Sequence, residues 1–184
     1  PPFPDDSGVS IGAALYGYFE GNANGSRSCL EHNYLGPGYD SEEVKTLVEN
    51  FGLKAQRYID IEQKVAQMLA DGKLIGWFQG RMEFGQRALG NRSILADPRT
   101  AGTQDKVNLA VKFREKFRPF APAILEECAN DYFVLDKDVT VPFMERVYPV
   151  REEKRSEIPA VVFIDGSGRL QTVSKKTKPR FHKL

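Results

Sequence analysis

The sequence predicts an α/β fold, an open twisted mixed sheet with flanking helices. Segments with helical and strand-like spacing alternate through the middle of the chain, and glycine or proline separates most of them. The 184 residues are 41% hydrophobic and 28% charged, a balance that is typical of a folded chain with a buried core and excludes wholesale disorder. The length suits one domain, or one domain with part of another.

The first 39 residues are expected to be separate from the rest. In residues 9–19, apolar side chains recur at helical spacing with small residues between them, which predicts a tightly packed helix. Residues 21–39 are rich in glycine, asparagine and serine, and this composition indicates a linker or a domain boundary.

Two capping patterns predict the next helices. Asp40 with Glu43 begins one helix, Asp60 with Gln63 begins another, and a glycine ends each. Between these helices and after the second, short strands are expected at residues 53–59 and 74–78.

The remaining elements are expected to be short. A helix is predicted at residues 104–111, and Asp165 with Gly166 predicts a tight turn. Further strands are predicted at residues 93–96, 120–125, 142–150, 160–164 and 169–174.

The composition excludes several classes of protein. No apolar run approaches the ~20 residues that a membrane-spanning helix needs. Cys29 and Cys128 are too few for a disulfide framework and lack the spacing of a zinc site, so we expect a cytoplasmic protein with no metal site of its own. The chain begins at Pro1 and not at Met, which indicates a fragment of a longer protein.

Basic residues are concentrated in one segment. The net charge of the chain is only +1, but residues 81–118 contain nine basic and four acidic residues. Six of the nine are arginine, whose planar guanidinium group suits bidentate binding of phosphate or carboxylate.

Residues 80–93 form the strongest local feature. They combine glycines, three arginines, and amide and hydroxyl side chains directly after an expected buried strand. Loops at the ends of strands in α/β sheets commonly bind phosphorylated ligands. The segment is not a Walker A loop, because no lysine follows a glycine with serine or threonine after it. The alternative is a sharp turn whose arginines pair with surface acids.

Residues 112–120 alternate cations with phenylalanines. An extended segment would place the cations on one face and the rings on the other, and the cationic row could bind a polyanion. The alternative is an edge strand that its charges protect from aggregation.

These segments resemble those of a known family. Residues 80–99 closely resemble the signature of the nodulation- and antibiotic-type O-carbamoyltransferases, and residues 112–122 and 165–173 resemble two further blocks of it. Residues 6–14 are similar to the end of that family's first, actin-like ATPase domain.

The resemblance implies a division of the chain into three parts. Residues 1–39 would be the end of the actin-like domain with a linker, residues 40–175 a YrdC-like domain with a concave basic face, and residues 176–184 an exit segment. The YrdC-like domain would form carbamoyl adenylate from carbamoyl phosphate and ATP. The actin-like domain would then pass the carbamoyl group to the hydroxyl of a small acceptor molecule.

The resemblance also implies where the ligands bind. Carbamoyl phosphate and the ATP triphosphate repel each other, so their negative charges must be neutralised before the two can be aligned for reaction. Fixed cations are therefore the main requirement of this chemistry. Carbamoyl phosphate is expected at Arg87, Lys112, Arg118 and Arg169. The ATP phosphates and ribose are expected at Arg81, Arg92, Ser93, Thr172 and Ser174, with Mg²⁺ arriving bound to ATP.

Two other interpretations stay open. YrdC-like domains elsewhere are associated with RNA, and rings interleaved with cations suit single-stranded nucleic acid, so the chain could be an RNA- or nucleotide-binding module without catalysis. The modest charge of the basic segment favours the small ligand over nucleic acid. The third interpretation is a fragment whose site is completed only by the missing domain.

Overall fold

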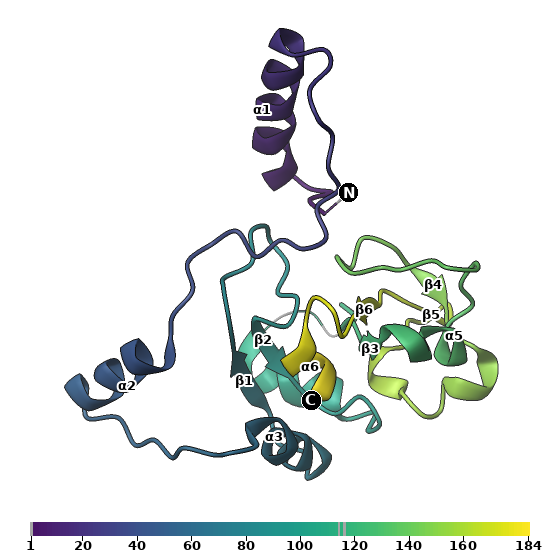
Figure 1. The fold of residues 1–184 in the computed structure, drawn as a ribbon. Coiled ribbons are helices and arrows are strands. Elements are labelled where there is room, and N and C mark those ends of the chain that lie inside the picture. The colour runs from purple at the N-terminus through teal and green to yellow at the C-terminus, as the bar shows by residue number, and fades with distance from the viewer. Residues whose placement is uncertain (1, 114, 116) are drawn as a thin grey trace.

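The chain forms a mixed α/β structure with several helices and small sheets (Figure 1). The computed structural model describes residues 2–113, 115 and 117–184. The α-helices are α1 (Ser7–Gly21), α2 (Ser41–Asn50), α3 (Ile61–Ala70), α4 (Thr103–Val107), α5 (Ala129–Tyr132) and α6 (Pro179–Lys183). The strands are β1 (Ile75–Phe78), β2 (Arg92–Leu95), β3 (Ala123–Leu125), β4 (Tyr148–Pro149), β5 (Ser167–Gly168) and β6 (Gln171–Val173). A π-helix continues α4, and three 3₁₀ turns complete the regular structure of the described chain: Asn108–Lys112, Glu126–Cys128, Glu152–Lys154 and Pro159–Val161.

Each sheet in the described residues has two strands. β1 pairs antiparallel with β2, β3 pairs parallel with β6, and β4 pairs antiparallel with β5. The single open sheet expected from the sequence is therefore not formed by the described residues. The observed strands are shorter than the predicted ones, since turns and 3₁₀ segments interrupt the extended stretches.

Two of the expected strands are wrong. Residues 53–58 have no regular secondary structure and lie exposed, because no strand of the described chain pairs with them. The stretch predicted at residues 160–164 begins instead as the 3₁₀ turn Pro159–Val161. Of the strand predicted at residues 142–150, only β4 forms.

The capping predictions for α2 and α3 are confirmed. Asp40 Oδ1 accepts a hydrogen bond from the backbone N–H of Glu43 (2.8 Å), and the Glu43 carboxylate accepts one from the backbone N–H of Asp40 (2.7 Å). Asp60 likewise accepts from the backbone N–H of Gln63 (3.0 Å). These bonds satisfy donors that the first turn of a helix leaves without a partner.

Two helices stand away from the rest of the molecule. Figure 1 shows α1 projecting from one end and α2 held off the body by extended segments, and neither helix contains a buried residue. The tight packing expected for residues 9–19 is therefore wrong: Leu15 is 51% exposed and Tyr16 71% exposed, because no other described element covers this helix. No helix in the described part of the chain has both the length and the apolar character needed to cross a membrane.

The core consists of two clusters. One gathers around α5, β4 and the residues before β6, and its most buried side chains are Phe133, Val141, Val150 and Leu170. The other joins α3, β1, β6 and α6 through Val65, Trp77, Val173 and Phe181. Because β6 contributes to the second cluster directly after Leu170 in the first, it connects the two halves of the body.

Candidate functional site

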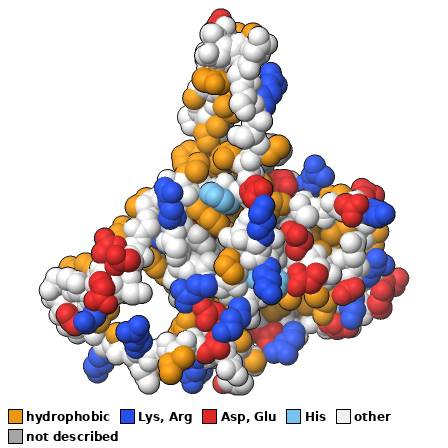
Figure 2. All heavy atoms as spheres, viewed as in Figure 1, with side chains coloured by type: hydrophobic (Ala, Val, Ile, Leu, Met, Phe, Trp, Pro, Cys, Tyr) orange, Lys and Arg blue, Asp and Glu red, His pale blue; other side chains and the backbone are white. Residues whose placement is uncertain are grey.

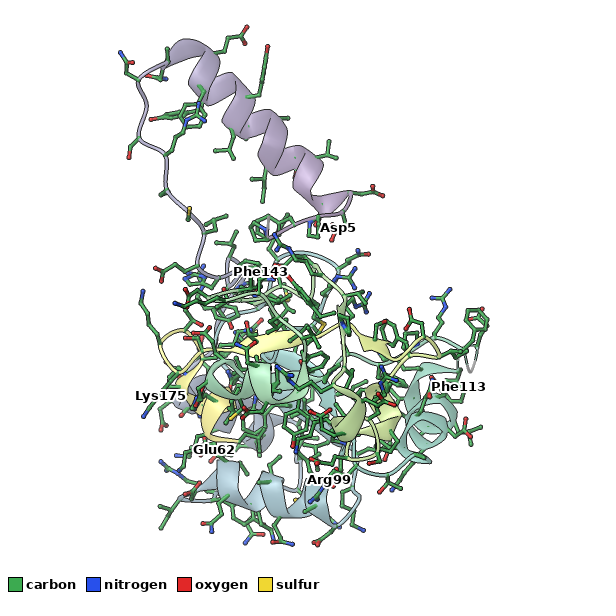
Figure 3. The ribbon with its side chains drawn as sticks, turned by 90° about the vertical axis from the view of Figure 1, so that its right-hand side faces the viewer. Asp5, Glu62, Arg99, Phe113, Phe143 and Lys175 are labelled. Atoms are coloured by element: carbon green, nitrogen blue, oxygen red, sulfur yellow. The ribbon has the colours of Figure 1, made fainter. Side chains whose placement is uncertain are left out.

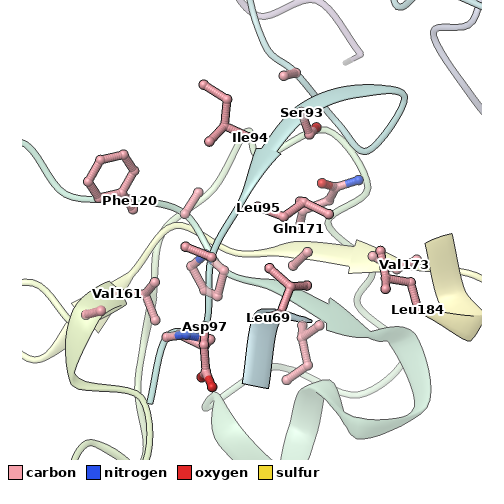
Figure 4. Close-up of a pocket in the computed structure, with 18 of the residues that line it drawn as sticks. Leu69, Ser93, Ile94, Leu95, Asp97, Phe120, Val161, Gln171, Val173 and Leu184 are labelled. Carbon is pink, nitrogen blue, oxygen red and sulfur yellow. The ribbon is translucent and has the colours of Figure 1, made fainter. Parts of the chain in front are cut away.

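A cavity of about 580 Å³ lies between the β1–β2 and β3–β6 sheets, next to α6. Figure 4 shows side chains of α3, β2 and β6 around it, among them Leu69, Leu95 and Gln171. Most of its lining is apolar, with a few polar groups between the apolar side chains. This composition is typical of a small-molecule site.

Two of the nine predicted site residues line this cavity, Ser93 and Lys112. Ser93 belongs to β2, and its hydroxyl accepts a hydrogen bond from the backbone N–H of Gly90 (2.9 Å). Lys112 is exposed at the end of the π-helix. Lys112 therefore gives the cavity wall an exposed cationic side chain, and the other lysine among the described lining residues, Lys183, is paired with Asp60.

The segments that carry the other three predicted carbamoyl phosphate residues also reach this cavity. Ala88, which follows Arg87, lines it, and so does Gln171, two residues after Arg169. Gln104, a third lining residue, donates a hydrogen bond to the backbone carbonyl of Arg118 (3.1 Å). The backbone thus brings together at one cavity the neighbours of residues that are far apart in the sequence.

The side chains of these three arginines have different surroundings. Arg118 is exposed and forms an ion pair with Glu115 (Nε to Oε2, 2.9 Å). Arg87 and Arg169 are both half-buried. Hydrogen bonds from Ser7 hold the pKa of Asp5 below its ordinary value, and the positive charge of Arg87 adds a smaller effect in the same direction.

Arg81 and Arg92 bind backbone carbonyls of the chain itself. Arg92 Nη1 donates to the carbonyl of Gln79 (2.6 Å), and the Arg92 guanidinium lies 3.5 Å from the centroid of the Phe78 ring. Arg81 donates from Nε to the carbonyl of Gly36 (2.9 Å) and from Nη2 to that of Leu35. Both side chains therefore hold the loop 80–91 in place.

Thr172 and Ser174 also make contacts within the chain. Side chains alternate along a strand, so Thr172 faces away from Gln171 and Val173, both of which line the cavity. Its buried hydroxyl accepts a hydrogen bond from the backbone N–H of Val141 (2.9 Å). The backbone carbonyl of Ser174 accepts one from the N–H of Lys178 (2.9 Å).

Glu83, which the sequence analysis did not select, fixes the shape of the loop 80–91. Its buried carboxylate accepts hydrogen bonds from the backbone N–H groups of Leu89 (3.0 Å) and Asn91 (2.7 Å). The side chain of Asn91 in turn donates to the carbonyl of Arg81 (2.7 Å). One feature of the sequence could have pointed to this residue: Glu83 is the one acidic residue among residues 80–93.

The segment 112–120 contains no strand in its described part. The π-helix ends at Lys112, and the next residue, Phe113, has a left-handed backbone (φ 47°). Residues 114 and 116 lie outside the described residues. Phe113 is 81% and Phe117 74% exposed. Figure 3 shows Phe113 at an outer edge of the molecule, far from Asp5.

The described residues contain no cluster of three or more His, Cys, Asp or Glu side chains that could hold a metal ion. The acidic residue in the cavity lining, Asp97, is bound by Arg99 (Nε to Oδ1, 2.9 Å), which holds the pKa of its carboxyl below the ordinary value. We therefore assign no side chain to Mg²⁺.

Comparison with known proteins identifies the family. Residues 66–184 match the family described as "Carbamoyltransferase C-terminus". The chain belongs to this family. The match confirms the family resemblance seen in the sequence. The described residues that line the 580 Å³ cavity all lie within the matched range.

Relatives with this carbamoyltransferase C-terminus are longer than the chain. Nodulation protein NolNO of Sinorhizobium fredii is 47% identical over 178 residues, which cover 95% of this chain and 26% of the relative. Nodulation protein NolO of Bradyrhizobium diazoefficiens is 46% identical over 184 residues, 98% of this chain and 34% of the relative. Nodulation protein U of Rhizobium tropici is 40% identical over 179 residues, 97% of this chain and 29% of the relative. The chain thus spans about a third or less of the length of these proteins.

Proposed function

We propose that the chain is the part of an O-carbamoyltransferase that forms carbamoyl adenylate from carbamoyl phosphate and ATP. The observation that carries this proposal is the match to the carbamoyltransferase C-terminus over residues 66–184, because that range contains all four residues expected to bind carbamoyl phosphate. The net reaction converts carbamoyl phosphate, ATP and water into carbamoyl adenylate, pyrophosphate and phosphate. The carbamoyl group would then go to an acceptor hydroxyl on a small molecule.

In this proposal Arg87, Lys112, Arg118 and Arg169 bind carbamoyl phosphate. Lys112 approaches the cavity directly, and the three arginines enter from chain segments that meet at its wall. Arg118 would exchange its surface ion pair with Glu115 for the ligand, and an exposed pair of this kind is worth little. Fixed cations of this sort stabilise the negative charge that two polyanions bring together.

ATP would enter the same cavity beside carbamoyl phosphate. The apolar lining offers a surface for the adenine ring, and Ser93 offers a hydroxyl near the phosphates. Arg81, Arg92, Thr172 and Ser174 would act on ATP by holding the adjacent loop and strand in place. Mg²⁺ would enter bound to the ATP phosphates and supply further neutralising charge there.

The rest of the proposal concerns the longer protein. We propose that residues 40–175 act as a YrdC-like domain with a basic face. Residues 1–39 would be the end of an actin-like domain that selects the acceptor, together with a linker. Residues 176–184 would form an exit segment toward a further C-terminal part of the longer protein. A cytoplasmic location fits reactants such as ATP. These assignments follow the family resemblance.

Carbamoyl-phosphate-dependent exchange of pyrophosphate into ATP tests the proposed reaction. Lys112→Ala and Arg87→Ala should each slow the exchange by roughly one to two powers of ten, because each removes a charged hydrogen bond to the ligand. Lys45→Ala removes an exposed lysine on α2, a helix that stands off the body (Figure 1) and contributes no described residue to the cavity lining, so it should leave exchange unchanged. Full exchange by both variants, with their unfolding curves unchanged, would refute the site assignment.

The exposed rings of Phe113 and Phe117 favour one second candidate, a module that binds single-stranded RNA. Stacking on these rings beside Lys112 and Arg118 would give binding that weakens steeply with salt and depends little on base sequence. Titration with a short RNA at two salt concentrations, with Phe113→Ala and Phe117→Ala as variants, tests it. Salt-insensitive or absent binding would exclude this candidate.

A further inference from the structure

A second cavity, of about 310 Å³, lies apart from the first. Residues 32 and 34 of the segment before α2, the turn that follows β1, and the start of α6 form its walls. Figure 2 shows a histidine side chain beneath α1 on one face of the molecule, with lysine or arginine side chains near it. The lining residues are His32, Tyr34, Gln79, Gly80, Arg81, Asn91, Thr177, Lys178, Pro179 and Arg180.

The buried Lys178 is the main feature of this cavity. It is only 5% exposed, and its Nζ donates a hydrogen bond to the backbone carbonyl of Leu89 (2.6 Å). Among the described residues no carboxylate forms an ion pair with it, because the nearby Glu83 accepts its bonds from backbone N–H groups. Burial lowers the pKa of Lys178 to about 8, so the amine still carries a proton at neutral pH. The charge of Glu83 offsets this effect of burial only in part. A buried cation that lacks a direct ion pair is costly, and an anion that approached it would lower that cost.

Two arginines add to the positive charge. The bonds from Arg81 to the carbonyls of Leu35 and Gly36 fix its guanidinium group without neutralising it. Arg180 is bound through Nε to Glu62 (2.6 Å), which leaves its two amino groups as donors. None of the described lining residues is acidic. The described lining therefore offers fixed N–H donors and contributes no carboxylate of its own.

Tyr34 and His32 supply the remaining polar groups. The hydroxyl of Tyr34 is buried and has no hydrogen-bond partner among the described residues, and burial raises the pKa of this side chain, so the hydroxyl remains a donor. His32 stacks on the Tyr34 ring with centroids 5.0 Å apart, and its Nδ1 accepts a bond from the backbone N–H of Tyr34. With Nδ1 as the acceptor, the ring proton is at Nε2, which is a further donor.

We propose that this second cavity binds a phosphate-bearing small molecule, with Lys178, Arg81, Arg180 and the Tyr34 hydroxyl as the groups that contact the phosphate. Phosphate oxygens accept several charged hydrogen bonds at once, and this donor set provides them from three separate chain segments. The stacked rings of His32 and Tyr34 give one aromatic wall for the rest of the ligand. The site includes two residues outside the carbamoyltransferase C-terminus match and is distinct from the cavity that Lys112 lines.

Calorimetric titration with inorganic phosphate and, separately, with AMP tests the proposal. All measurements are made in the Lys112→Ala background, which removes the proposed carbamoyl phosphate contact. Lys178→Met should weaken binding of both probes at least tenfold, and Tyr34→Phe by roughly three- to tenfold. Equal affinity for the two probes identifies free phosphate as the ligand, and tighter AMP binding identifies a nucleotide.

Two controls make the result specific. Lys176→Met removes an exposed lysine two residues before Lys178. This lysine pairs with Glu31, so the substitution should change affinity less than twofold. Tyr34→Phe deletes only a hydroxyl that has no hydrogen-bond partner among the described residues, so it should leave the unfolding curve unchanged. This variant therefore tests the proposal even where Lys178→Met is unstable. The proposal is overturned by absence of saturable binding at millimolar phosphate, by wild-type affinity in Tyr34→Phe, or by equal losses in the Lys176 and Lys178 variants.

Discussion

Gln171 on β6 donates a hydrogen bond from Nε2 to the backbone carbonyl of Leu89, 82 residues earlier in the chain (2.8 Å). Both residues are almost fully buried, so this bond connects the last strand to the loop 80–91 inside the body. Lys178 donates to the same carbonyl. The shape of both cavities therefore depends on where this part of the loop is held.

Gln171→Leu should lower the free energy of unfolding by about 1–3 kcal/mol, since a buried acceptor loses one partner. Chemical unfolding in urea measures the change. Gln63→Leu is the matched control, because the Gln63 side chain is exposed on α3 and its backbone makes the capping bond; it should shift stability by less than about 0.5 kcal/mol. Equal effects of the two substitutions would contradict the role of the Gln171 bond.

Glu83→Ala should destabilise the protein by about 2–4 kcal/mol, because the backbone N–H groups of Leu89 and Asn91 then stay buried without an acceptor. Glu83→Gln retains an oxygen that can accept and should recover at least half of that loss. Urea unfolding of the two variants checks the order. A glutamine variant as unstable as the alanine variant would contradict the prediction that an accepting side-chain oxygen is what residue 83 contributes to stability.

Gly90→Ala should cost about 3 kcal/mol. The glycine has a φ of 106°, and an added Cβ would lie 2.5 Å from Cδ1 of Phe181, so both backbone strain and crowding oppose it. Gly17→Ala on α1 has no neighbouring atom within 4 Å of the new Cβ and should leave thermal unfolding of the body unchanged. A Gly90→Ala variant with the same thermal unfolding temperature as the parent protein would contradict this prediction.

The stability of the parent should rise between pH 8 and pH 10.5 relative to Lys178→Met. Burial lowers the pKa of Lys178 to about 8 in the folded state, against an ordinary value of 10.5, and the charge of Glu83 opposes this shift in part. Between these values the unfolded chain binds more protons, so the free energy of unfolding increases with pH. Urea unfolding across this range tests it, and parallel pH profiles for the two proteins would contradict it.

Local signals in the sequence were reliable where the structure depends on neighbouring residues. The capping pair Asp40 and Glu43 was predicted correctly, because such a cap needs only a residue three positions away. The strand expected at residues 53–59 was wrong, because a strand also needs a partner that the local sequence does not specify. The chain-wide alternation of helices and strands predicted the α/β class but not the division into small sheets.

The candidate sites show the same difference between features that the local sequence specifies and features that depend on distant parts of the chain. Lys112 and Ser93 were selected from composition and family resemblance, and both line the larger cavity. Thr172 faces the other side of its strand, which only the pairing of β6 with β3 reveals. Tyr34 and Lys178 meet across 144 positions of sequence (ring centroid to Nζ, 5.5 Å), and no local motif marks either of them.

The most direct measurement of the central claim is a crystal structure of the protein with carbamoyl phosphate and a non-hydrolysable ATP analogue. The account predicts carbamoyl phosphate in the larger cavity, within hydrogen-bond distance of Arg87, Lys112, Arg118 and Arg169. Carbamoyl phosphate bound elsewhere, with these four side chains directed to separate surfaces, would contradict it.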